Sequence, residues 1–267
     1  MPEPIVTDTQ PQGLEEKVYL PTAPLLTHFV GRPRGPGAGG QAPPAVQALP
    51  AEQMLSNIVL GALIRGFYVS GSGNSRVVCA SDISPAELRW AFHQGLNTRG
   101  RYEPWAVVLD RTAMWQAGMR PVLYVEDEME NQFRQSTGEI RGPEWAALVV
   151  RTSLGQTGRS DWTHEREWRY CFQGDSTNPS LDIRTAVKAV VTGTRGWKPN
   201  RTSVFDPEVN LTYSPNYSFE RWFWNGSRLV KDGTVTVATP SQDEEDEEER
   251  RRQDEDDRLL REHLGLE

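Results

Sequence analysis

Glycine and proline divide this sequence into short pieces. Of its 267 residues, 23 are Gly and 19 are Pro, and its uninterrupted apolar runs are only a few residues long. Proline disrupts the interior of a helix and the hydrogen-bond ladder of a central strand, and glycine weakens both. The chain must therefore fold as short strands and helices joined by many turns. Its composition excludes a collagen, a coiled coil and a wholly disordered chain.

Several segments have the pattern of a strand or a helix. Residues 24–30 form a compact β-prone run between Pro24 and Gly31, which predicts a buried strand. Apolar residues at i, i+3 and i+4 predict a helix that opens at Pro50 and ends at Gly66. Further strands are predicted at 67–70, 76–81, 105–109, 121–125, 165–172 and 186–191, and further helices at 84–94, 112–117 and 144–150.

The C-terminal third predicts a β-meander. Asn225-Gly226 and Asp232-Gly233 are turn dipeptides flanked by apolar residues, so we expect three strands over 221–237. Many short strands with few helices, and no regular β-α-β alternation, predict an α+β fold. We expect a single domain with a mixed or antiparallel sheet.

Composition sets the expected domain limits. Residues 1–22 are polar with four prolines and are predicted to be a disordered lead-in; 23–240 form the α+β domain. Within it, residues 31–50 hold five Gly and five Pro, which predicts a loop, either a mobile flap or an inert insertion. Residues 241–267 are predicted to be an acidic, partly helical tail.

The acidity of the chain is concentrated in that tail. The net charge is -8, and residues 243–267, with 13 acidic residues and 5 Arg, account for all of it. A neutral remainder gives no indication of nucleic-acid binding. The tail is either a solvated segment, or a partner-binding helix whose leucine face docks while its acidic part meets a basic surface.

Cysteine content and the N-terminus indicate a compartment. Cys79 and Cys171 are the two cysteines, with no C-x-x-C spacing for zinc or redox chemistry, so we expect a reducing environment. The N-terminus lacks a signal-peptide pattern, and no apolar run is long enough to span a bilayer. These features predict a cytoplasmic protein without a membrane association, and 25 Arg against 4 Lys favours a GC-rich bacterial source.

The segment 160–170 has the highest density of chemically useful residues. If it is a strand, Glu165, Glu167 and Arg169 share one face and His164, Arg166, Trp168 and Tyr170 share the other. Such a row of charges can bind a sugar hydroxyl or a cation, or shift the pKa of a neighbouring carboxyl. It can also be a cross-strand charge ladder on a solvated face.

Other residues have a structural and a functional interpretation. His28 in an apolar strand is either a satisfied core histidine or a functional group. Asp82 either follows a strand as a site residue or caps the next helix, and Cys79 is either buried and inert or a nucleophile. A metal site would need His28, His164 and acids brought together, and we expect no metal.

The order of blocks along the chain resembles a known family. The blocks are Leu26-Thr27-His28-Phe29, a helix ending Leu63-Ile64-Arg65-Gly66, Val78 to Asp82, Tyr102 to Val107, Gly118 to Tyr124, Trp162 to Arg169 and Ala189 to Gly193. Their succession resembles the bacterial abortive phage-infection family of the AbiGi type and its uncharacterised relatives. The resemblance implies phage defence, as the antitoxin-like half of a two-component system, with a cognate toxin or phage component as protein partner.

The layout also resembles that of ADP-ribosyltransferases, in which an early His or Arg and a late Glu hold NAD. This resemblance implies that His28 orients the nicotinamide ribose and that Tyr68 or Tyr102 stacks on the nicotinamide ring. Glu167 binds the ribose hydroxyl and stabilises the transition state, and Glu165 activates the acceptor. Ser81 and Arg169 complete the expected cofactor-binding set.

Two classes of function therefore remain open. One is an NAD-dependent, ADP-ribosyltransferase-like enzyme of an antiphage system. The other is a non-enzymatic antitoxin or sensor that binds a protein partner through its acidic tail. We expect the first if Glu165 and Glu167 face a pocket shared with His28, and the second if they face open solvent.

Overall fold

A nine-stranded mixed sheet organises the molecule. The computed structural model describes residues 5–9, 24–30, 49–68, 75–83, 85–93, 102–126, 129–141, 143–152, 166–174, 179–200 and 216–238, together with Arg250 and Arg258. These residues form an α+β fold, as the sequence predicts. The expected Gly/Pro-rich loop at 31–50 lies almost wholly outside the described residues, and so does the tail apart from its two arginines.

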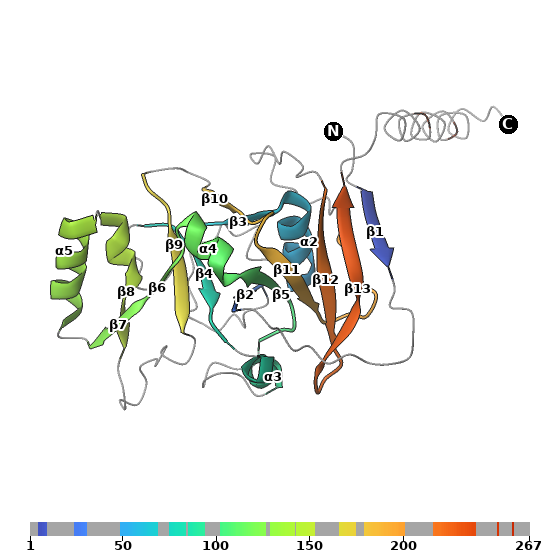
Figure 1. The fold of residues 1–267 in the computed structure, drawn as a ribbon, viewed down its shortest axis with the longest axis horizontal. Coiled ribbons are helices and arrows are strands. Elements are labelled where there is room, and N and C mark those ends of the chain that lie inside the picture. The colour runs from blue at the N-terminus through green and yellow to red at the C-terminus, as the bar shows by residue number, and fades with distance from the viewer. Residues whose placement is uncertain are drawn as a thin grey trace.

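The sheet extends from β1 at one edge to β6 at the other (Figure 1). In spatial order its strands are β1 (Ile5–Thr9), β13 (Leu229–Ala238), β12 (Tyr217–Trp224), β11 (Val187–Thr192), β5 (Ala106–Asp110), β2 (Leu25–Phe29), β4 (Val77–Ser81), β9 (Glu167–Cys171) and β6 (Arg120–Pro121). The pair β11–β12 is parallel, and the other pairs in this sheet are antiparallel. Neighbouring strands are therefore often distant in sequence.

Two small sheets and the helices complete the fold. β3 (Leu63–Arg65) pairs with β10 (Ser180–Asp182), and β7 (Leu123–Glu126) pairs in parallel with β8 (Val149–Thr152). The helices are α2 (Ala51–Gly61), α3 (Pro85–His93), α4 (Arg111–Ala117), α5 (Glu130–Arg141) and the 3-10 helix η2 (Pro143–Leu148). Figure 1 shows α5, β7 and β8 together at the β6 end of the molecule.

Local sequence signals explain the limits of α4. The Asp110 carboxylate accepts a hydrogen bond from the Ala113 N–H at 2.9 Å, as an N-cap residue does. Gly118 ends the helix in the left-handed region, at φ +110°, and donates its N–H to the last turn. This short helix therefore connects β5 directly to β6.

Alternation along the strands gives the sheet two apolar faces. One face packs against α2 and α4, with residues such as Leu26, Val107 and Met114 in its core. The other face packs against α3, where Phe29 and Trp222 meet Leu88 and Phe92 of that helix. Because Leu26 and Phe29 lie on opposite sides of β2, the middle of the sheet is buried on both faces.

The helix predicted to run to Gly66 is shorter than expected. α2 ends at Gly61, Ala62 takes the left-handed C-cap conformation, and the next three residues form β3. Gly66 has a different role, because a Cβ atom there would lie 2.3 Å from Cε2 of Phe172. Its lack of a side chain permits this close approach, and the C-cap prediction was wrong.

Two other regions differ from the prediction. The helix predicted at 144–150 is confirmed only as far as Leu148, as the 3-10 helix η2, because the β-branched pair Val149-Val150 begins β8 and aligns with β7. The helix α5 was not predicted. Ile5–Thr9, within the expected disordered lead-in, forms β1 against β13.

The predicted meander is correct at Asn225-Gly226 but not at Asp232-Gly233. Asn225 and Gly226 lie in the turn between β12 and β13, whereas Asp232-Gly233 lies inside β13. The register shifts there, so two residues of β13 oppose Arg221 of β12, which is a β-bulge with Gly233 at φ +116°. The third strand beside this hairpin is β1.

Candidate functional site

Four of the predicted site residues lie on three neighbouring strands. His28 is on β2, Ser81 is on β4, and Glu167 and Arg169 are on β9, in the spatial order β2-β4-β9. Thr27 pairs with Ser81, and Ser81 pairs with Glu167. Since adjacent strands are about 4.8 Å apart, β2 and β9 lie about 10 Å apart. Residues that pair across strands share a face, so Ser81, Glu167 and Arg169 lie on the same face as Thr27, whereas His28 lies on the other face, with Leu26. We call Ser81, Glu167 and Arg169 the polar row.

The His28 ring is anchored by the backbone of the next strand. Its Nδ1 lies 2.7 Å from the carbonyl oxygen of Cys79. A carbonyl oxygen only accepts, so Nδ1 carries the hydrogen, and in the neutral ring Nε2 is then the acceptor. The side chain is half-buried, so this contact fixes the orientation of a histidine that retains some access to solvent.

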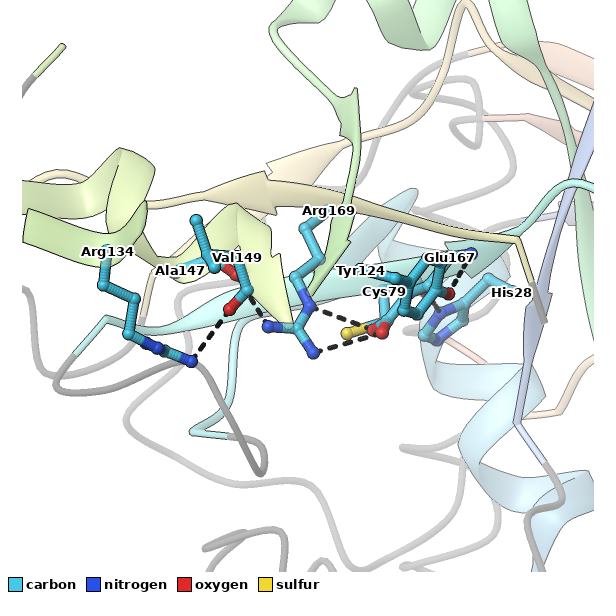
Figure 2. A network of polar contacts seen from close by, with 8 residues as sticks. All are labelled: His28, Cys79, Tyr124, Arg134, Ala147, Val149, Glu167 and Arg169. Atoms are coloured by element: carbon cyan, nitrogen blue, oxygen red, sulfur yellow. Dashed lines mark hydrogen bonds and ion pairs between the residues drawn. The ribbon is translucent and has the colours of Figure 1, made fainter. Parts of the chain in front are cut away.

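Glu167 and Arg169 form a two-point ion pair inside the fold (Figure 2). Nε and Nη2 of Arg169 donate to the two carboxylate oxygens of Glu167 at 3.0 and 3.1 Å. The residues are 6% and 2% exposed, respectively. An arginine fork that contacts both oxygens is the strong form of such a pair, and it keeps the carboxylate ionised.

The remaining contacts of Arg169 tie the sheet to the segment before β8. Its Nη1 donates to the carbonyl oxygen of Ala147 in η2 at 2.7 Å. Burial alone lowers the pKa of the Arg169 guanidinium, but the Glu167 charge and hydrogen bonds and the nearby Cys79 outweigh burial, so the pKa lies above its ordinary value. Arg169 is therefore a permanent cation in the interior.

Tyr124 and Arg134 extend this network toward α5 (Figure 2). The backbone N–H of Glu167 donates to the Tyr124 hydroxyl oxygen at 2.9 Å. Nη2 of Arg134, on α5, donates to the Val149 carbonyl oxygen at 2.8 Å. These contacts hold β7, β8 and α5 against the strand that carries Glu167.

The alternation predicted for this strand is confirmed from Glu167 to Tyr170, but not at Arg166, which lies before β9 at φ +42° and pairs with Glu87 of α3. Glu167 and Arg169 contact each other from one face, while Trp168 and Tyr170 pack against the core that includes α2 and α4. Both charged residues are buried, so they do not form a ladder on a solvated face. Glu165 and His164 lie outside the described residues.

Three further residues predicted to bind the cofactor lie in different surroundings. Ser81 is 1% exposed, directly opposite Glu167. Tyr102 is buried, and its ring stacks on Phe29 with centroids 4.4 Å apart, so it belongs to the core beside α3. Tyr68 is half-buried, and the Arg76 guanidinium lies 5.1 Å from its ring centroid.

Asp82 forms an ion pair with Arg111, and no contact among the described residues shows it capping a helix. Its Oδ2 accepts a hydrogen bond from Nη1 of Arg111, at the start of α4, at 2.7 Å. The pair lies one residue beyond Ser81, on the partly exposed end of β4. It thus joins β4 to α4 beside the polar row.

Sequence reasoning missed Tyr124 and a second buried ion pair. Tyr124 belongs to the Gly118–Tyr124 block of the family resemblance, which was a usable signal. The second pair joins Nε of Arg221 to Oδ2 of Asp232 at 2.8 Å, with both side chains buried. Because Asp232 was interpreted as a turn residue, its ion pair with Arg221 was not predicted.

Two further observations concern metals and membranes. Within the described parts of the chain, no three His, Cys, Asp or Glu side chains are grouped so that they could hold a metal ion, and both cysteines are thiols. Among the helices that the structure describes, none has the length and apolar character needed to cross a membrane.

Comparison of the chain with protein-family models, with curated proteins and with solved structures finds no match. The functional argument therefore depends on the residues themselves.

Proposed function

We propose that this chain is a cytoplasmic bacterial antiphage protein of the abortive-infection type, and that its polar row binds NAD as an ADP-ribosyltransferase does. One observation carries the proposal. The blocks of the family resemblance that contain His28, Ser81, Tyr124 and Glu167 are far apart in sequence but lie on β2, β4, β6–β7 and β9, which are neighbours at one end of the fold. Three of them, His28, Tyr124 and Glu167, belong to one network of polar contacts (Figure 2).

The chemistry of the row suits a ribose. An ionised carboxylate accepts hydrogen bonds from sugar hydroxyls, and it stabilises positive charge that develops at the anomeric carbon when the bond to nicotinamide breaks. Glu167 is held ionised by Arg169, and an oxygen with two lone-pair directions can accept from a hydroxyl as well as from the guanidinium. His28, anchored through Nδ1, lies on the other face of the sheet and does not line the same surface as Glu167.

Burial assigns different roles within the row. Ser81 and Arg169 have almost no exposed surface, so they position Glu167 rather than touch the nucleotide. Glu167 is the residue proposed to contact the ribose. The recorded hydrogen bonds of Arg169 go to Glu167 and Ala147, so the diphosphate of NAD would be bound by groups outside the polar row.

The alternative function is a non-enzymatic antitoxin or sensor that binds a protein partner. One observation favours it: Glu167 and Arg169 satisfy each other inside the fold, as a purely structural ion pair does. Under this alternative the polar row stabilises the attachment of η2 and β8, and function lies on the surface.

Expression in a bacterial host separates the two. If the chain is an NAD-consuming enzyme, its expression slows growth or blocks phage replication, and Glu167→Gln removes the effect, whereas His28→Ala, on the other face of the sheet, does not. If it is an antitoxin, its expression is harmless and relieves the toxicity of a neighbouring gene, and both variants retain that ability as long as they fold.

The matched control is Asp232→Asn. It disrupts the other buried arginine–carboxylate pair, in β12 and β13, and should destabilise the fold for the same physical reason. The enzymatic function is supported if Glu167→Gln loses the effect on growth or phage replication while Asp232→Asn keeps it, at equal levels of soluble protein. Equal loss in both assigns the effect to stability and contradicts the proposed site.

A further inference from the structure

Tryptophan and arginine side chains alternate on the surface beside α4 and β6. The Arg120 guanidinium lies 3.8 Å from the Trp115 ring centroid and 6.0 Å from that of Trp145. The Trp115 ring meets Trp168 edge-on at 6.0 Å, and the Arg111 guanidinium lies 5.9 Å from the Trp168 ring. We call these five residues the Trp–Arg patch.

This patch presents apolar surface to solvent. Trp115 is 48% exposed, one of the few large apolar side chains of the described residues with so much accessible area. Trp168 and Trp145 are partly exposed beside it. Tryptophan and arginine are among the residues that contribute most of the binding energy in protein interfaces. An exposed tryptophan next to an arginine is therefore typical of a protein-binding surface.

The patch also carries a positive charge that no carboxylate of the described residues neutralises. Arg111 is paired with Asp82 at 2.7 Å. Arg120 instead donates Nη1 to the carbonyl oxygens of Trp115 and Met119, and no carboxylate of the described residues forms an ion pair with it. A cation held flat against an indole ring still attracts an anion on its open side.

We propose that the Trp–Arg patch binds the acidic C-terminal segment 243–267 of the same molecule. That segment carries the whole net charge of -8 and, near its end, Leu259, Leu260, Leu264 and Leu266. It therefore offers both groups that the patch lacks, a carboxylate for Arg120 and an apolar side chain for Trp115. This inference is independent of NAD binding.

The segment is long enough to reach the patch. Ala238 ends β13, and six steps between neighbouring strands separate β13 from β9 in the sheet. At about 4.8 Å a step this is about 29 Å. Arg120 lies one strand further, on β6, about 34 Å from β13. The fifteen residues from 239 to 253 can span up to about 50 Å when fully extended, so the acidic residues 254–257 and the leucines after them can contact the patch from within their own chain.

The first test uses the full-length chain with its eleven acidic residues between 243 and 257 replaced by Asn or Gln, which frees the patch. A labelled synthetic peptide of residues 243–267 is titrated into it at low salt, followed by fluorescence anisotropy. We expect saturable binding that Arg120→Gln and Trp115→Ala each weaken at least tenfold. Arg89→Gln, which removes an equally charged exposed arginine on α3, should leave the affinity unchanged.

Thermal unfolding confirms that each variant is folded, since Arg120 also donates to two backbone carbonyls. Absence of saturable binding would overturn the proposal. Equal weakening by Arg120→Gln and Arg89→Gln would also overturn it, because the peptide would then respond only to overall charge.

The second test asks whether the contact is intramolecular. Hydroxyl-radical oxidation of the unmodified full-length chain should reach Trp115 several-fold more slowly than in the charge-neutralised chain, at protein concentrations from nanomolar upward. Trp90, which is 57% exposed on α3, should react equally in both. Protection that appears only at high protein concentration would assign the segment to a second copy and contradict the inference.

Discussion

Arg169 contacts both carboxylate oxygens of Glu167 through two different nitrogens, although the two residues lie on the same strand only two positions apart. Side chains at i and i+2 of a strand point to the same face, and this geometry makes the pair possible. With the Ala147 carbonyl as third acceptor, the guanidinium connects the sheet to η2. The pair is thus both the support of the proposed site and part of the fold.

Removing one member of this pair should be costly. Glu167→Leu leaves a buried, unpaired guanidinium, and Arg169→Met leaves a buried carboxylate, so each should lower the free energy of unfolding by about 3–5 kcal/mol. The double variant should lose less than the sum, because neither charge is then left unpaired. Urea unfolding of the four proteins measures this coupling.

The exposed pair Asp182–Arg184 provides the control for that cycle. Its side chains are about half exposed, so Asp182→Asn should cost less than about 1 kcal/mol. A loss for Glu167→Leu no larger than this control would mean that the ion pair does not stabilise the fold.

The second buried pair should behave like the first. Asp232→Asn leaves Arg221, which is completely buried, without its carboxylate and should lower the free energy of unfolding by about 3–5 kcal/mol. Thermal or urea unfolding measures the loss. A change below about 1 kcal/mol would show that the bulge of β13 does not depend on this pair.

Asp110 should make stability depend on pH. The hydrogen bond from the Ala113 N–H, with help from Lys188, lowers the pKa of the Asp110 carboxyl below its ordinary value. Its contribution is therefore present above the pKa of the unfolded chain, about 3.9, and is lost as the pH falls through the lower pKa of the folded state. Asp110→Asn should cost about 0.3–1 kcal/mol at pH 7.

That cost should shrink in acid, where the wild-type carboxyl is itself protonated. Urea unfolding of both proteins at pH 7 and near pH 3 tests this. A difference that stays constant, or that grows on acidification, would contradict the assignment of Asp110 as a charged N-cap.

Gly66 should not tolerate a side chain while Phe172 is present. Gly66→Ala places a Cβ atom 2.3 Å from the Phe172 ring and should cost about 1–3 kcal/mol by overpacking. Combining it with Phe172→Leu should make the alanine nearly neutral relative to Phe172→Leu alone. If the alanine costs the same in both backgrounds, contact with the ring is not the cause.

Local patterns predicted the parts of this fold that depend on neighbouring residues. The run before Gly31 is a strand, the 112–117 region is a helix, and the alternation of Glu167 with Trp168 places them on opposite faces. Each of these follows from spacing or capping within a few residues.

The errors arose where distant partners decide the outcome. Asp232-Gly233 has the sequence of a turn, but pairing with Arg221 on β12 keeps it inside a strand. Gly66 resembles a helix end, but the Phe172 ring explains why it is glycine. For the same reason the sequence could place Glu167 and Arg169 on one face but could not show that they neutralise each other.

The most direct test of the central claim is a calorimetric titration of NAD into the full-length protein. The account predicts saturable binding that Glu167→Gln weakens at least tenfold, while His28→Ala, on the other face of the sheet, and Asp232→Asn, folded at the same temperature, bind as the wild type does. No heat of binding at millimolar NAD, or equal affinity in all four proteins, would contradict the proposed NAD site.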